Sequence, residues 1–131
     1  MTDTARFTIT MTPGAELQAG SGRFDFTKTW TGCLEGTSTG TMLTAGDPAS
    51  GSSGYVALEI FEGSFGGRQG TIAFQQSGTM AGGAPQLSYR ISPWSGTDQL
   101  AEITGELEIA DVCEDGVHVV TVTEQAAGES A

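Results

Sequence analysis

The stretch YVALEIFEGSFGGRQGTIAFQQS, residues 55–77, decides the fold class of this chain. Residues 55–63 and 71–77 each read as a strand, and the glycines between them mark a hairpin. Both faces of the 55–63 segment are largely apolar, so one face is predicted to line a core and the other to contact a second subunit. Glu59 is then a carboxylate with apolar neighbours on every side.

The same signature recurs along the chain. Twenty of the 131 residues are glycine, a residue that suits tight hairpins, bulges and sharply coiled strands. About eight strands joined by short connections predict an all-β fold, an eight-stranded antiparallel up-and-down barrel. The further strands are expected at residues 5–12, 23–31, 86–92, 105–112 and 117–123, with two short pieces within 32–44 broken by Gly36 and Gly40.

Two segments depart from the strand pattern. Residues 45–54, AGDPASGSSG, predict a mobile loop that closes over the barrel mouth. One short helical turn is expected near 97–103, with Thr97 as its N-cap. Length favours one domain, residues 1–124, followed by a flexible tail, 125–131.

The charge balance excludes several partners. Sixteen acidic residues against five basic ones give a formal charge of −11, and the basic residues are scattered. Neither nucleic acid nor an anionic membrane surface is therefore expected as a partner. There is no apolar run long enough to span a bilayer and no secretory signal pattern at the start, which predicts a cytoplasmic location.

Metal and cofactor chemistry is not predicted. The chain has one His and two distant cysteines, too few for a usual zinc site, and no phosphate-binding loop motif. Cys33 and Cys113 are interpreted as small buried apolar residues, with a disulfide as the alternative.

Four polar residues are expected on inward faces: Lys28, Glu59, Gln76 and His118. One interpretation is a satisfied internal network in which Lys28 pairs with Glu59 and Gln76 bridges them, fixing the fold without chemistry. The other is a ligand-anchoring or proton-transfer site, with Glu59, Lys28 and His118 as catalytic candidates.

The expected lumen wall suggests what it would hold. We predict that an apolar or aromatic small molecule binds there, and that the protein is a homodimer. The alternatives are an isomerase or cyclase that shapes a reactive intermediate, and a structural barrel with a filled core. The predicted ligand-binding residues are Trp30, Tyr55, Phe61, Phe74, Gln76, Tyr89 and Trp94.

Four stretches in order resemble patterns of the DUF3224 family. They are TKTWTGCLEG (27–36), LEIFEGSFGGRQGTIAFQQSGTM (58–80), SGTDQLAEITGE (95–106) and DGVHVVTVT (115–123). The resemblance implies an allene-oxide-cyclase-like barrel, often dimeric, whose wider superfamily includes dirigent proteins and polyketide cyclases that fold reactive apolar intermediates. It implies no particular reaction. Gln76 stands where the family usually has His; if relatives use that His in chemistry, this chain has lost a base there.

Overall fold

The structure, a computed structural model, describes residues 2–125 as a barrel of eight strands in chain order. The strands and short 3-10 turns are β1 (Thr2–Pro13), β2 (Gly22–Gly32), β3 (Leu34–Asp47), η1 (Pro48–Ser50), β4 (Ser52–Phe65), β5 (Arg68–Ala81), β6 (Ala84–Ile91), η2 (Asp98–Leu100), β7 (Thr104–Val112) and β8 (His118–Gln125). The predicted fold class is confirmed. The tail predicted for 125–131 lies outside the described residues, apart from Gln125, which ends β8.

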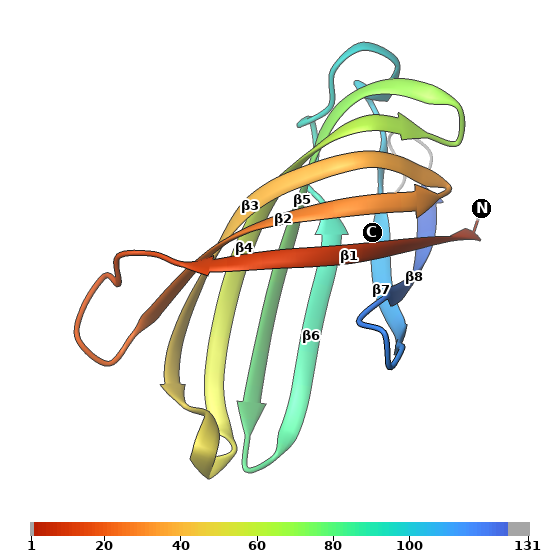
Figure 1. Cartoon of the computed structure of the whole chain (residues 1–131). Coiled ribbons are helices and arrows are strands. Elements are labelled where there is room, and N and C mark those ends of the chain that lie inside the picture. Colours follow the sequence, from red (N-terminus) through yellow and green to blue (C-terminus); the bar gives the residue numbers. More distant parts are fainter. Residues whose placement is uncertain (1, 126–131) are drawn as a thin grey trace.

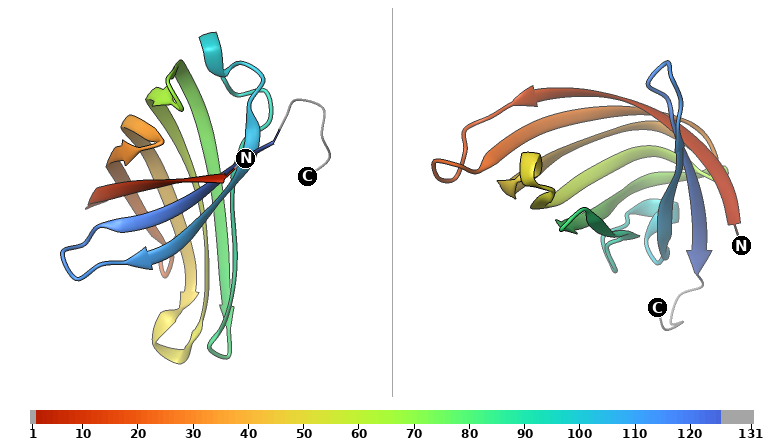
Figure 2. Two further views of the ribbon diagram at one scale, coloured as in Figure 1. Left: turned by 90° about the vertical axis from the view of Figure 1, so that its right-hand side faces the viewer. Right: turned by 90° about the horizontal axis from the view of Figure 1, so that it is seen from below.

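Each strand pairs antiparallel with its neighbours, and β1 pairs with β8 to close the barrel. Figure 1 shows β1 to β6 as one broad, curved sheet with the β7–β8 hairpin set to one side of it. The view from below in Figure 2 shows how strongly this sheet curls. Long hairpins join its middle strands: β3 and β4 stay in register from Leu34 opposite Phe65 to Asp47 opposite Ser52.

The junction between β6 and β7 is the least paired part of the barrel wall. Their register consists of a single pair, Arg90 opposite Glu106. Apart from this pair, the two strands diverge. By contrast, β7 and β8 pair along their length from Thr104 opposite Gln125 to Val112 opposite His118. We call this junction the β6–β7 seam.

One end of the barrel is packed solid. Trp30, Phe61 and Phe74 are at most 2% exposed, and their rings meet edge-on or stacked at centroid separations of 5.9–6.5 Å. Leu100 and Ile103, in the segment after β6, are also buried there, as the predicted helical turn requires. That turn is shorter than expected, a 3-10 turn at Asp98–Leu100.

Two predictions about local structure are wrong. The 32–44 segment is not two broken pieces: from Leu34 onward it is part of the continuous strand β3, and Gly32 ends β2. Its glycines lie where the backbone of the neighbouring strand approaches closely: a Cβ on Gly36 would lie 2.2 Å from the carbonyl oxygen of Glu62 in β4. The loop expected at 45–54 is also mostly strand, since β3 runs to Asp47 and β4 starts at Ser52.

An ion pair joins distant strands outside the packed end. Arg68, at the start of β5, donates two hydrogen bonds to Glu124 of β8, at 2.9 and 2.5 Å. These hydrogen bonds are the main cause that lowers the pKa of the Glu124 carboxyl below its ordinary value.

A pH dependence follows from this pair. A carboxyl with a lowered pKa in the folded state stabilises the fold above its unfolded pKa, and the contribution is lost as the pH falls through the folded value. We expect the wild type to lose more unfolding free energy between pH 6 and pH 3 than Glu124→Gln does. Urea titrations of both proteins at the two pH values measure this. An equal loss in both would contradict it.

Candidate functional site

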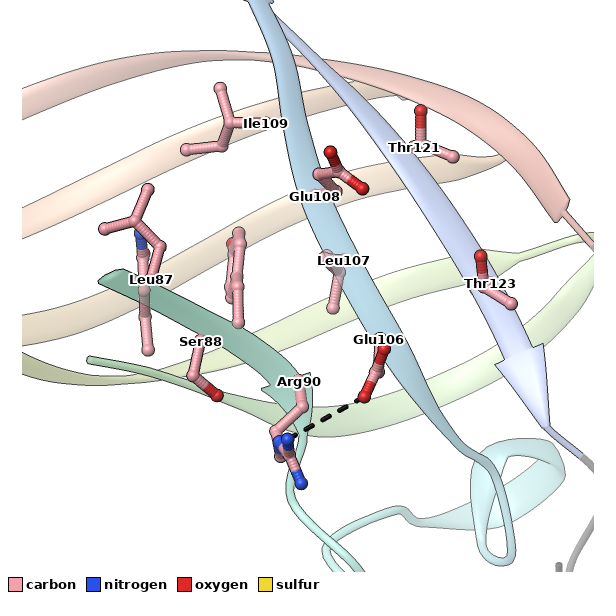
Figure 3. Close-up of a pocket in the computed structure, with 11 residues that line it drawn as sticks. Leu87, Ser88, Arg90, Glu106, Leu107, Glu108, Ile109, Thr121 and Thr123 are labelled. Atoms are coloured by element: carbon pink, nitrogen blue, oxygen red, sulfur yellow. Dashed lines mark ion pairs between the residues drawn. The ribbon is translucent and has the colours of Figure 1, made fainter. Parts of the chain in front are cut away.

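The candidate site is a pocket of about 460 Å³ at the β6–β7 seam. Figure 3 shows side chains of β6, β7 and β8 around it, with the Arg90–Glu106 ion pair at one end. The residues that line it are Gln76, Leu87, Ser88, Tyr89, Arg90, Glu106, Leu107, Glu108, Ile109, Thr121 and Thr123. Strand alternation sorts them: the inward-facing members are mostly apolar, and those facing outward are polar or charged.

Tyr89 connects the pocket to a buried polar network. The Tyr89 hydroxyl donates to Glu59 Oε1 at 2.7 Å, and Lys28 Nζ donates to the same oxygen at 2.9 Å and to the Tyr89 hydroxyl at 3.0 Å. The other Glu59 oxygen accepts from Ser38 Oγ at 2.5 Å, and Ser38 Oγ in turn accepts from Trp30 Nε1 at 3.0 Å. Among the described residues, no buried side-chain polar atom lacks a partner.

Lys28, the only lysine of the chain, is surrounded by aromatic rings. It is 3% exposed, and its Nζ lies 4.3 Å from the Phe7 ring centroid and between 5.1 and 5.6 Å from three others. Burial lowers the pKa of the Lys28 ammonium, and the negative charge of Glu59 opposes this effect. Burial, followed by the Glu59 charge, raises the pKa of Tyr89 well above its ordinary value, so the phenol remains protonated.

A glycine makes room for this network. Gly40 lies between Phe26 on β2 and Glu59 on β4 in the strand register. A Cβ at this position would come within 2.6 Å of the Phe26 ring and 2.7 Å of the Glu59 Cβ. The glycine therefore leaves room for the Phe26 ring between β2 and β4.

The predicted Lys28–Glu59 pair is confirmed, but the predicted bridge is wrong. Gln76 does not join them; its Nε2 donates to the Tyr55 hydroxyl at 2.7 Å, and Tyr89 takes the bridging position. Gln76 lies two residue pairs along β5 from Phe74, which is the partner of Glu59, and it faces Tyr89 on β6 in the pocket wall instead.

His118 stands apart from the pair. Its ring stacks on Phe7 with centroids 4.5 Å apart, and its Nδ1 lies 3.2 Å from the Gly116 carbonyl oxygen. Within residues 2–125 no hydrogen bond joins it to Lys28 or Glu59. A shared proton pathway through all three predicted catalytic residues is therefore not present in this geometry.

The predicted ligand-binding residues separate into three groups. Tyr89 and Gln76 line the pocket, and Tyr55 supports Gln76. Trp30, Phe61 and Phe74 belong to the packed end of the barrel and none of them lines the pocket.

Trp94 is outside the barrel and 80% exposed, because Pro93 ends the strand pairing and the chain leaves the sheet. Its prediction as a lumen residue is wrong.

Several important residues were missed by the sequence prediction. Ser38 completes the hydrogen bonds of Glu59, and Leu87 and Leu107 supply apolar pocket wall. Alternation would have placed Ser38 on the inner face of β3. Nothing local in the sequence indicates that the wall opens beside Leu87.

The cysteines and possible metal ligands add no second site. Cys33 and Cys113 are free; Cys33 is half-buried, with a pKa raised by burial to about 11, and Cys113 is exposed rather than buried as predicted. Within the described residues, no three His, Cys, Asp or Glu side chains group as a metal site. No helix in residues 2–125 combines the length and apolarity needed to cross a membrane.

Comparison with known proteins identifies a family whose function is unknown. The family model described as a protein of unknown function, DUF3224, matches residues 3–123. The crystal structure of a DUF3224 protein of unknown function from Shewanella oneidensis MR-1 is similar, with 33% identity, a TM-score of 0.86, and coverage of 100% of this chain and 98% of that chain. No curated protein matches. The implied link to the allene oxide cyclase superfamily stays a prediction. The chain belongs to the DUF3224 family.

Proposed function

We propose that the protein binds an apolar or aromatic small molecule in the pocket at the β6–β7 seam. The pocket itself carries the proposal: its volume of about 460 Å³ falls within the range of about 300–1,000 Å³ typical of small-molecule sites. Tyr89 and Leu107 on its inner side are only 6% and 5% exposed, so a ligand there meets well-packed walls.

Leu87 indicates what kind of molecule fits. It lies on the inner side of β6 yet is 66% exposed, which is unusual for an apolar side chain in a barrel interior. A ligand body covering it would remove this surface from water at about 25 cal/mol per Å².

The predicted isomerase or cyclase is less well supported by the geometry. Such an enzyme needs a group that exchanges a proton with its substrate. Lys28, Glu59 and Tyr89 instead hydrogen-bond one another, and only Tyr89 lines the pocket. Catalysis therefore stays a prediction, and binding is the function that the site supports best. The cytoplasmic location likewise stays a prediction.

The binding proposal is tested with prodan, an uncharged naphthalene dye whose emission moves to shorter wavelength in apolar surroundings. We expect saturable binding by the wild type. Leu87→Gln should raise the dissociation constant about tenfold, equivalent to about 1.4 kcal/mol, because it removes apolar wall. Leu17→Gln is the matched control, since Leu17 is 76% exposed and does not line the pocket. Equal affinity of both variants, or no saturable binding, would contradict the proposal.

We also infer that the outer face of β4 is a contact between two copies of the chain. Val56, Leu58 and Ile60 are 51–55% exposed there. Their register partners on the flanking strands carry no charge: Thr39, Thr41 and Leu43 on β3, and Ala73, Gln75 and Ser77 on β5. Two molecules with a charge of −11 each repel one another least where neither presents charge.

This contact predicts a dimer that one added charge disrupts. The wild type should sediment at twice the mass of one chain at about 50 μM, a working concentration within the micromolar range of ordinary association. Leu58→Glu should sediment as a monomer with an unchanged circular dichroism spectrum. Thr4→Glu, on an exposed position of β1 beside β8, serves as the control and should remain dimeric. A monomeric wild type, or a dimeric Leu58→Glu, would refute the contact.

A further inference from the structure

The charges around the seam pocket restrict the class of ligand. The pocket is lined by one cationic side chain, Arg90, and two anionic ones, Glu106 and Glu108. All three belong to the outward-facing set, so they lie at the entrance, while Leu87 and Leu107 (Figure 3) form the apolar side together with Tyr89. The pocket therefore combines an apolar interior with a charged rim.

The rim is negative on balance. Arg90 faces Glu106 with a separation of 3.7 Å between its Nη2 and the Glu106 Oε1, so these two charges largely offset each other. Glu108 lies two residues after Glu106, on the same face of β7. It is exposed and has no ion-pair or hydrogen-bond partner among residues 2–125. The surplus charge at the entrance is the Glu108 carboxylate.

The rest of the molecule reinforces this sign. The formal charge of −11 produces a negative potential over the surface, which concentrates cations and repels anions at an entrance with low-dielectric walls. A ligand with an apolar body and a carboxylate head, such as a fatty acid, would bring its charge next to Glu108. A ligand with an ammonium head would be attracted there instead.

We propose that the ligand of the seam pocket is a hydrophobic amine, an inference that rests on the proposed binding function. The apolar body of the amine contacts Leu87, Leu107 and Tyr89, and its ammonium group stays at the entrance beside Glu108. The amine remains partly hydrated there, so its desolvation cost is small. Exposed charge pairs contribute modestly, so the apolar body supplies most of the affinity and Glu108 supplies the selectivity.

Three naphthalene probes that differ only in the head group test this inference: 2-naphthylmethylamine, 2-naphthalenemethanol and 2-naphthoate. Binding is measured by calorimetry at pH 7 in 10 mM buffer. The amine should bind about three- to fivefold more tightly than the alcohol, which corresponds to an exposed pair, and the naphthoate should bind least. Added salt at 0.5 M should remove most of the difference by screening.

Two variants separate the local charge from the overall charge. Glu108→Gln should lower amine affinity about threefold, a change of the size expected for an exposed pair, while leaving the alcohol unaffected. Glu35→Gln makes the same change in net charge on β3, at a residue that does not line the pocket, and should preserve the order of the three probes. Preference for naphthoate, or an amine advantage that survives in Glu108→Gln, would overturn the inference while leaving the binding function intact. Failure of all three probes to bind would overturn both.

Discussion

Replacing Lys28 by methionine is expected to lower the free energy of unfolding by about 3–5 kcal/mol, the usual cost of removing one partner from a buried ion pair. The methionine fills a similar volume, so the loss comes from Glu59, which is 2% exposed and would be left buried without its cationic partner. Guanidinium chloride unfolding followed by tryptophan fluorescence measures the change.

The double variant Lys28→Met/Glu59→Gln gives the decisive comparison. Its neutral amide still offers an acceptor to Tyr89, so most of the lost stability should return. Arg6→Met, at an exposed position of β1, removes a positive charge without leaving a buried partner and should change stability by less than about 0.5 kcal/mol. If the double variant were as unstable as Lys28→Met alone, the loss would have to come from packing, not from the unpaired carboxylate.

Replacing Phe61 by alanine is expected to cost about 3–5 kcal/mol as well, by a different mechanism. Phe61 is 0% exposed, stacks on Phe74 and meets Trp30 edge-on, so its removal leaves a cavity in the packed end. Chemical unfolding measures this loss.

Because Phe61 does not line the seam pocket, the folded fraction of Phe61→Ala should bind prodan with wild-type affinity. Leu87→Gln should show the reverse behaviour, with a stability change of less than about 0.5 kcal/mol because the residue is on the exposed part of the wall, and weaker binding. A Phe61→Ala protein that is fully folded but has lost prodan binding would show that the packed end and the pocket are not separate.

Much of the fold follows from alternation in the sequence. The 23–31 segment places Phe26, Lys28 and Trp30 on one face, and all three are buried in the barrel as predicted. The pairing of Lys28 with Glu59 follows as well, because two opposite charges on the inner face of one barrel have no better partner.

The remaining features depend on how strands meet, which single strands do not encode. Gly36 was interpreted as a break, but it is a place where β3 and β4 approach too closely for a side chain. Gln76 has the inward direction expected of it, yet its partner is Tyr55 since the register offsets it from Glu59. The β6–β7 seam, with its single residue pair, depends on how the two strands meet, and neither segment signals it alone.

The seclusion of Lys28 has a practical consequence for labelling. No other side chain in the sequence carries a primary amine, and this one is shielded by rings and a carboxylate. An acylating reagent applied to the folded protein is therefore directed to the terminal amino group. Slow acylation of the side chain would report transient opening of the barrel, so the protein contains its own probe of conformational fluctuation.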